Sequence, residues 1–112
     1  MESKIFKIPG EKIRELIKPM GGCYATDSIT IDGNKVLVMI RDEPSFENDS
    51  GWFFMSGLES QEYIDDPQNI MIYEVNTIAN YDPSIIPFLN FPVGSRLERC
   101  SDTDEFELIE EW

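Results

Sequence analysis

The sequence predicts an α+β fold, with one N-terminal helix followed by a mainly antiparallel sheet that short helical turns interrupt. Helical spacing of apolar residues is confined to residues 11–18, directly before Pro19. Beyond Pro19 the apolar segments are short and rich in β-branched and aromatic residues, which is typical of strands. The 112 residues, 41% of them hydrophobic, suffice for one domain over residues 1–112 with its own core.

The helix is predicted over residues 11–18 because Ile13, Leu16 and Ile17 then share one face. Glu11 falls in its first turn and Lys18 in its last, which is the arrangement that the helix dipole favours. Pro19 cannot continue the helix and is expected to end it.

A β-hairpin centred on Gly33 is expected next. Residues 23–26 and 28–31 have the composition of extended chain. Asp32-Gly33-Asn34 is a turn signal, because glycine adopts positive φ without steric cost. Residues 36–41 form the clearest strand, since β-branched and apolar residues dominate them.

The remaining chain is expected to alternate strands with turns, after a polar loop at 42–50. Further strands are predicted at 52–56, 70–75, 96–100 and 106–110. Short helical turns are predicted at 60–64 and 76–81. The run from Asn76 to Pro83 is expected to be structural, because Asn and Asp side chains bond backbone groups in turns and Pro83 fixes the exit.

The charge distribution is strongly uneven. Twenty-two acids against nine bases give a net charge of −13. No lysine or arginine lies between Arg41 and Arg96, whereas five of the nine bases lie in the first 18 residues. Direct binding to nucleic acid or to an anionic membrane is therefore not expected, because both require basic side chains. The acidic stretch could steer a basic partner, or it could serve solubility alone.

The expected compartment is the cytoplasm. The first residues lack the apolar stretch and small-residue cleavage site of a secretory signal, and no apolar run approaches the roughly 20 residues of a membrane span. Cys23 and Cys100 form no C-x-x-C pair and are expected to pack as small hydrophobic residues. Whether they lie close in space is left open by the sequence.

Catalytic chemistry finds little support in the sequence. The chain has no histidine and no phosphate-binding glycine loop, and nothing near Cys23 in the sequence would lower the pKa of its thiol. A carboxylate site at Asp65, Asp66 and Asp82 could bind a hard cation, but adjacent acids before a proline more often cap a helix. We therefore expect no enzyme, no cofactor and no metal.

The aromatic run Trp52-Phe53-Phe54 is a candidate contact surface. Alternate residues of a strand face opposite sides, so either Phe53 or the pair Trp52 and Phe54 faces the core. An exposed Trp52 inside an acidic rim would suit a binding hot spot, although a sheet covered on both faces would bury all three. The candidate partner-binding residues are Asp49, Trp52, Glu62, Asp65, Asp66 and Asp82.

A series of short motifs runs from Gly22 to Arg99. They are Gly22-Cys23, Asp32-Gly33, Lys35-Val36, Arg41-Asp42-Glu43-Pro44, Asp49-Ser50-Gly51-Trp52 with Phe54 and Gly57, Asn69-Ile70, Ile72-Tyr73, Asn76-Thr77-Ile78-Ala79-Asn80-Tyr81-Asp82-Pro83, Ile86-Pro87, and Pro92-Val93-Gly94-Ser95 with Glu98-Arg99. In these motifs the chain resembles a bacterial family first described as a domain of unknown function. That family was later grouped, as immunity protein family thirty-three, with the immunity proteins of polymorphic toxin systems. The chain departs from the pattern at Asn34 and at Met39-Ile40.

The resemblance implies a cytosolic protein that neutralises a cognate toxin by binding it. The expected partner is thus a protein, with a basic toxin as the case that the acidic charge suits. Two alternatives stay open: an interaction or regulatory module of another cytoplasmic pathway, and a metal-dependent enzyme that uses carboxylates. The residues predict neither an oligomeric state nor the identity of the toxin.

Overall fold

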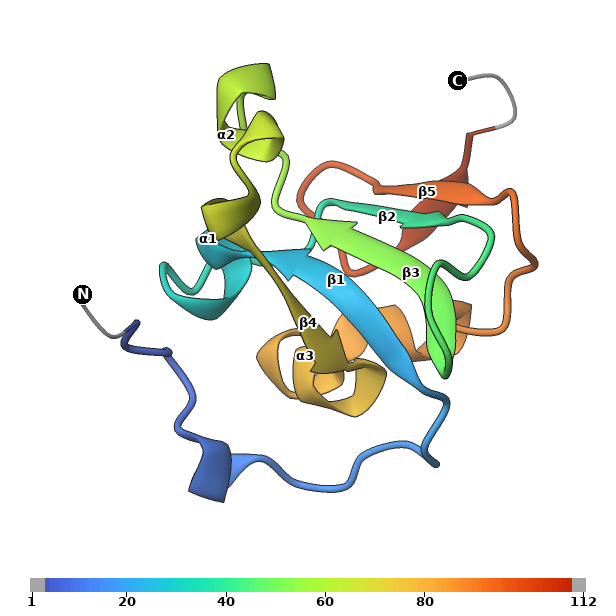
Figure 1. Ribbon diagram of the computed structural model, residues 1–112. Helices are drawn as coiled ribbons and strands as arrows, with labels where there is room; N and C mark the ends of the chain where they lie inside the picture. Colours follow the sequence, from blue (N-terminus) through green and yellow to red (C-terminus); the bar gives the residue numbers. More distant parts are fainter. Residues whose placement is uncertain (1–3, 110–112) are drawn as a thin grey trace.

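A six-stranded mixed sheet forms the centre of the computed structural model, which describes residues 4–109 (Figure 1). The strands are β1 (Gly22–Thr26), β2 (Val38–Arg41), β3 (Asp49–Met55), β4 (Ile70–Glu74), β5 (Arg96–Arg99) and β6 (Phe106–Leu108). The α-helices are α1 (Asp27–Thr30), α2 (Gln61–Asp65) and α3 (Val75–Tyr81), and the 3-10 helices are η1 (Gly10–Lys12), η2 (Pro67–Asn69) and η3 (Pro83–Phe88).

The strand order is β4-β1-β3-β2-β5-β6, in which β1 and β3 run parallel and all other neighbours run antiparallel. The α+β class is thus confirmed, with a mixed rather than purely antiparallel sheet. β3 lies between β2 and β1 in the sheet. It pairs antiparallel with β2, its neighbour in sequence, and parallel with β1, which makes the sheet mixed.

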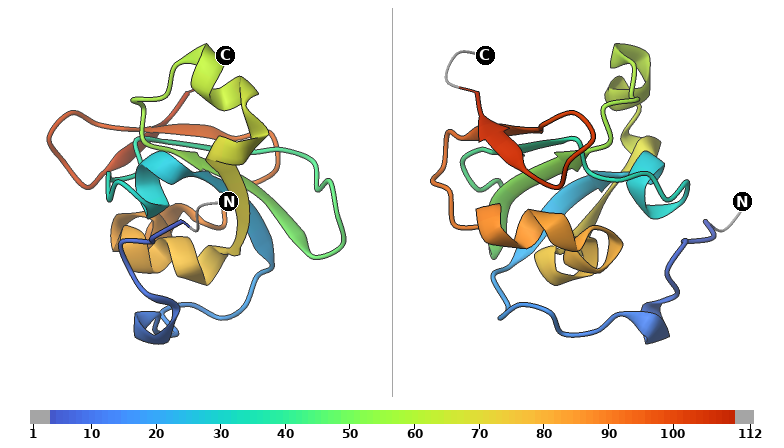
Figure 2. Two further views of the ribbon diagram at one scale, coloured as in Figure 1. Left: turned by 60° about the vertical axis from the view of Figure 1, so that its left-hand side comes forward. Right: turned by 180° about the vertical axis from the view of Figure 1, so that it is seen from behind.

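One face of the sheet is covered by α3 and η3, which lie in front of the strands in the rear view of Figure 2. The hydrophobic core lies between these helices, α1 and that face. Its buried members are Cys23, Ala25, Ile29, Val36, Met39, Trp52, Phe54, Val75, Ile78, Ala79, Ile85, Leu89, Leu97 and Phe106. None of the helices within residues 4–109 packs across the opposite face of the sheet, which is seen in Figure 1.

Strand positions are mostly as predicted. Strands occur within or across the segments 36–41, 52–56, 70–75, 96–100 and 106–110, although β2 begins only at Val38. β3 begins three residues earlier than expected, at Asp49. The helical turns predicted at 60–64 and 76–81 correspond to α2 and α3. Residue 110 of the last predicted strand lies outside the described residues.

The N-terminal helix predicted over residues 11–18 is wrong. Helical geometry there is limited to the single 3-10 turn η1, and no side chain caps it. An isolated eight-residue segment cannot repay the cost of helix nucleation on its own, and β-branched Ile13 and Ile17 weaken it further. Instead the segment runs extended below α3, and its backbone groups bond to side chains of that helix (Figure 1).

The hairpin centred on Gly33 is also wrong, because β3 separates β1 from β2 in the sheet. Residues 28–30, expected to be extended, belong to helix α1, which carries Ile29 into the core. The turn at Gly33 is real, but it ends a helix: the Gly33 N–H donates to the carbonyl of Ile29, and φ is +79°. Glycine at this position is a common helix terminator.

Candidate functional site

The uncovered face of the sheet presents large apolar side chains from four adjacent strands. Tyr24 on β1 lies opposite both Phe53 on β3 and Ile72 on β4, and Phe53 in turn lies opposite Ile40 on β2. Directly opposed residues share one face of a sheet, so these four form an apolar surface. Ile72 is 54% exposed, whereas Tyr24 and Phe53 are half-buried.

The aromatic run on β3 is divided between the two faces. Trp52 and Phe54 are fully buried and stack with ring centroids 5.9 Å apart. The indole N–H of Trp52 donates to the carbonyl of Leu89 at 3.1 Å. Trp52, expected as an exposed anchor, therefore belongs to the core, because its polar atom is satisfied inside the protein. The aromatic side chain of this run that lies on the uncovered face is that of Phe53.

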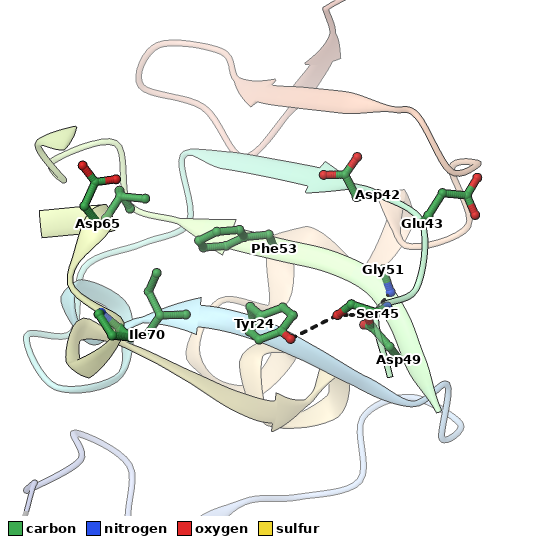
Figure 3. Close-up of a pocket in the computed structure, with 11 residues that line it drawn as sticks. Tyr24, Asp42, Glu43, Ser45, Asp49, Gly51, Phe53, Asp65 and Ile70 are labelled. Atoms are coloured by element: carbon green, nitrogen blue, oxygen red, sulfur yellow. Dashed lines mark hydrogen bonds between the residues drawn. The ribbon is translucent and has the colours of Figure 1, made fainter. Parts of the chain in front are cut away.

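A hollow of about 490 Å³ opens on this face (Figure 3). Its apolar lining is Tyr24, Phe53, Ile64, Pro67 and Ile70, and its remaining lining is Asp42, Glu43, Ser45, Asp49, Gly51 and Asp65. We call this feature, defined by these eleven residues, the acidic hollow. Aromatic and aliphatic groups form its floor, and carboxylates stand around its edge.

The wall of the acidic hollow formed by the β2–β3 loop is fixed by Asp49. One oxygen of the Asp49 carboxylate accepts from the backbone N–H of Ser45 at 2.7 Å, and the other accepts from that of Gly51 at 2.8 Å. The Tyr24 hydroxyl bonds the Ser45 hydroxyl at 3.1 Å, and the Tyr24 ring packs edge-on against Phe46. These contacts tie the loop to β1 and to the start of β3.

The opposite wall is formed by α2 and η2. Ser60 caps α2 by accepting from the Tyr63 N–H, and Asp66 caps η2 by accepting from the Gln68 N–H. Asp65, at the end of α2, faces the acidic hollow, and the side-chain amide of Gln61 donates to it at 2.9 Å. One of the two adjacent acids is thus a structural cap, while the other lines the hollow.

No basic side chain lines the acidic hollow among the described residues. Arg41, the neighbour of Asp42 in sequence, turns to the opposite side of the sheet. Its guanidinium donates to the carbonyls of Ser50 and Phe91, and it lies over the indole of Trp52 at 5.5 Å from the ring centroid. The carboxylates at the rim therefore keep an uncompensated negative potential over a partly apolar surface.

The six candidate partner-binding residues are separated by the fold. Asp49 and Asp65 are brought together in the acidic hollow. Glu62 is exposed on α2 but does not line the hollow. Asp66 is an exposed cap, and Trp52 and Asp82 are buried at 0% and 4% exposure. Burial removes the latter two from any surface that a partner meets.

Nine of the eleven lining residues were not among the six candidates, and they include Tyr24, Asp42, Glu43 and Phe53. Asp42 and Glu43 lie in the stretch without basic residues, which was a usable signal. The sequence left open whether Phe53 or the pair Trp52 and Phe54 faces the core. The burial of Trp52 shows that Phe53 lies on the other face. Tyr24 had no signal, because its place depends on the parallel pairing of β1 with β3.

The carboxylates once considered as a cation site do not meet. Asp82 lies at the end of α3, and α2, which carries Asp65, projects at the opposite end of the molecule (Figures 1 and 2). Over residues 4–109 no group of three or more His, Cys, Asp or Glu side chains is placed to hold a metal ion. Asp65 and Asp82, two of the three carboxylates of the proposed cation site, therefore lie in different parts of the fold.

The two cysteines are free thiols, of which Cys23 lies on β1 and Cys100 directly follows β5. Cys23 lies in the core on β1, where burial, together with the nearby Asp49 carboxylate, raises the pKa of its thiol far above the ordinary value. The thiolate that a nucleophile requires is therefore not formed at neutral pH. Cys100 follows β5, which lies three strand spacings from β1, or about 14 Å, so the two sulfurs are not neighbours.

The fold and the acidic hollow define a small acidic α+β protein with one uncovered sheet face. The chain belongs to the immunity protein Imm33 domain family, because the model of that family matches residues 23–110. The family suspected from the motifs is thereby confirmed. No curated protein and no solved structure matches the chain. Among the described helices, none has the length and apolar character to cross a bilayer.

Proposed function

We propose that this protein is a non-catalytic inhibitor that neutralises a toxin protein in the cytoplasm by direct binding. Membership of an immunity protein family supports the class of function. The observation that carries the binding mode is the acidic hollow, in which an aromatic floor lies inside a rim of carboxylates without a basic neighbour.

Such a site suits a partner surface with lysine or arginine side chains around an apolar protrusion. Long basic side chains lay their aliphatic stems on aromatic rings and place their charged ends against carboxylates. Tyr24 and Phe53 offer two rings with centroids 6.3 Å apart, and Asp42, Glu43 and Asp65 provide charge at the edge. A basic toxin fits this description.

The charge and the apolar floor have different roles in the proposed complex. Long-range attraction to a net charge of −13 raises the rate of encounter with a basic partner. Burial of Tyr24 and Phe53 sets the lifetime, because residues in a desolvated centre carry most of the binding energy of an interface.

Rescue of growth tests this function. The immobilised protein first captures its partner from lysate of the source cell, and the captured protein is then expressed in a sensitive host with either wild-type or variant chain. We expect the wild type to restore growth. Tyr24→Ala with Phe53→Ala should fail to do so while remaining folded.

Two outcomes would contradict the proposal. If the captured protein is harmless to the host, the protein is an interaction module of another pathway. If the toxic partner is neutralised equally by the wild type and the double variant, inhibition occurs but the acidic hollow is not its site. A chain with Asp102→Asn, at the exposed β5–β6 turn, serves as the control for a surface change elsewhere.

A further inference from the structure

The N-terminal segment, residues 4–20, contacts the rest of the protein largely through its backbone. It runs extended beneath α3 as the blue trace of Figure 1, and we call it the strap. On α3, Asn76 and Asn80 are four residues apart and therefore point to the same side of the helix. Both side-chain amides face the strap.

These two amides form five hydrogen bonds with backbone groups of the strap. The Asn80 carbonyl oxygen accepts from the Arg14 N–H at 2.9 Å, and its amide nitrogen donates to the Arg14 carbonyl at 2.8 Å. The Asn76 oxygen accepts from the N–H groups of Leu16 and Ile17, at 2.8 and 3.2 Å, and its nitrogen donates to the Arg14 carbonyl at 2.8 Å. The two amides thus satisfy backbone N–H and carbonyl groups of the strap, as a neighbouring β-strand would.

One residue further along, Tyr81 extends the same pattern. Its hydroxyl accepts from the Ile8 N–H at 3.2 Å and donates to the Ile8 carbonyl at 3.3 Å. Because these bonds are made to main-chain atoms, they do not depend on which side chains the strap carries at these positions. Arg14, Glu15 and Leu16 are accordingly exposed.

A few side chains anchor the strap. Ile17 and Met20 pack against the core, and Phe6 packs edge-on against Tyr73 with ring centroids 6.1 Å apart. Main-chain bonds for affinity, with separate pockets for selected side chains, are the features by which proteins recognise extended peptides.

The strap and the rest of the protein carry opposite net charges. Residues 1–20 contain five bases and three acids, for a net +2, while residues 21–112 contain four bases and nineteen acids, for a net −15. Lys4 illustrates the attraction, because its ammonium pairs with the Asp27 carboxylate at 2.9 Å and also donates to the Gln68 carbonyl. The strap is a basic segment lying on an acidic body.

We propose that the outer side of α3 is a second binding site, built for an extended, positively charged peptide segment of a partner protein and filled by the chain's own strap in the free protein. A tethered ligand competes at an effective concentration in the millimolar range, so the strap occupies the site until it is displaced or its tether is cut. This proposal does not depend on the acidic hollow.

Cutting the tether provides the test. A protease site is inserted between Lys18 and Pro19, both exposed, and the folded full-length protein is cleaved. We expect the freed strap to remain bound in gel filtration. A fluorescein-labelled synthetic peptide of residues 4–18 should then exchange into the cleaved protein, measured by fluorescence anisotropy, and should bind the uncleaved protein far more weakly.

The contribution of the two amides is separated by changing the peptide instead of the protein. A peptide with N-methyl groups on the Arg14 and Leu16 nitrogens cannot donate these bonds, and we expect it to bind the cleaved protein at least about tenfold more weakly. In the protein, Asn76→Ala with Asn80→Ala should give a similar loss. Asn90→Ala, an exposed asparagine outside α3, should give none.

Two results would overturn the proposal. If the strap leaves the wild-type protein as soon as the tether is cut, the side of α3 does not bind a peptide in trans. If the methylated and unmethylated peptides bind equally, the segment is held by its apolar anchors alone and the amides do not form a recognition site. A peptide of the same composition in scrambled order measures attraction by charge alone.

Discussion

The carboxylate of Asp82 and the guanidinium of Arg99 form an ion pair in which both side chains are buried, at 5% and 7% exposure. The pair joins the junction of α3 and η3 to the end of β5. Asp82 also accepts from the Val36 N–H at 3.0 Å, and Arg99 also donates to the Val36 carbonyl at 2.9 Å. Both backbone groups of Val36, just before β2, are thus satisfied by one charged pair.

Removing one partner of this pair should strongly destabilise the fold. Asp82→Ala leaves the Arg99 charge buried without its main counter-ion, which typically costs about 3–5 kcal/mol of unfolding free energy. Urea denaturation monitored by circular dichroism measures the loss. Asp104→Ala is the matched control, because Asp104 pairs with the same arginine but is 76% exposed, and its removal should cost about 1 kcal/mol or less. Equal losses in the two variants would contradict a structural role specific to the buried pair.

Adjacent aromatic residues of β3 should respond differently to truncation. Trp52→Ala empties a fully buried position and should lower stability by about 3–5 kcal/mol. Phe53→Ala, on the uncovered face, should lower it by only about 1 kcal/mol. Thermal melts of the two variants check this prediction. A larger loss for Phe53→Ala would mean that the uncovered face is part of the stabilising core.

Glu59 should contribute a pH-dependent term to stability. Burial raises the pKa of its carboxyl, but hydrogen bonds from the Thr26 hydroxyl and from the Ser56 N–H outweigh it and hold the pKa below its ordinary value. The folded state therefore binds the proton less readily than the unfolded state. The stabilisation is present above the unfolded pKa of about 4.3 and is lost as pH falls through the lower folded pKa.

Glu59→Gln tests this term. The variant should be less stable than the wild type at neutral pH by about 1–3 kcal/mol, because it loses charge-assisted hydrogen bonds. The difference should shrink as the pH falls below about 4. Denaturant titrations across acidic pH measure it, with exposed Glu107→Gln as the control. A difference between wild type and Glu59→Gln that does not change with pH would refute the assignment.

Gly51, where β3 bends beside the acidic hollow, should not tolerate a side chain. Its φ is +91°, and a methyl group there would overlap the Asp42 carbonyl oxygen. Gly94 has a similar φ of +97° but open space around the position of a Cβ atom. Gly94→Ala should thus cost about 1–3 kcal/mol from backbone strain, and Gly51→Ala about 1–3 kcal/mol more from the overlap. Similar melting temperatures for the two variants would show that the loop yields.

In the proposed complex, the rim charges should affect mainly the association rate, and the aromatic contacts mainly the dissociation rate. Glu43→Gln with Asp65→Asn should slow association and reduce its salt dependence, because rim charges steer the encounter. Asp66 is left unchanged, since it caps η2. Phe53→Ala should instead speed dissociation and cost about 2 kcal/mol or more. Surface plasmon resonance against the captured partner at low and high salt measures both effects, and a salt-independent association rate would exclude steering.

Much of the fold could be predicted from local pattern, and the failures share one cause. β2, β3 and β4 were found because β-branched and aromatic runs are intrinsically extended. The segment 11–18 was misassigned because its spacing is helical, while the amides of Asn76 and Asn80, about sixty residues away in the chain, offer its backbone better partners. The local sequence of residues 11–18 does not indicate that such a distant partner exists.

The candidate site shows the same division. The acidic character of the region and its place between Arg41 and Arg96 were evident from charge alone. The choice among individual residues was not, because it depends on which side of the sheet each faces. Asp82 was the clearest error: its sequence context is that of a turn, and its role as partner of Arg99 arises only when the junction of α3 and η3 meets the end of β5.

The sequence by itself determined the strand-rich α+β class, the acidic charge and the family, because composition, β-propensity and motif spacing are properties of the chain. The tertiary structure decided that Phe53 and not Trp52 lies on the uncovered face, that β3 lies between β1 and β2, and that the N-terminal segment is an extended strap. Each of these depends on contacts between residues distant in the chain. Packing of the core and long-range pairing of backbone groups fix such contacts, and no local pattern encodes them.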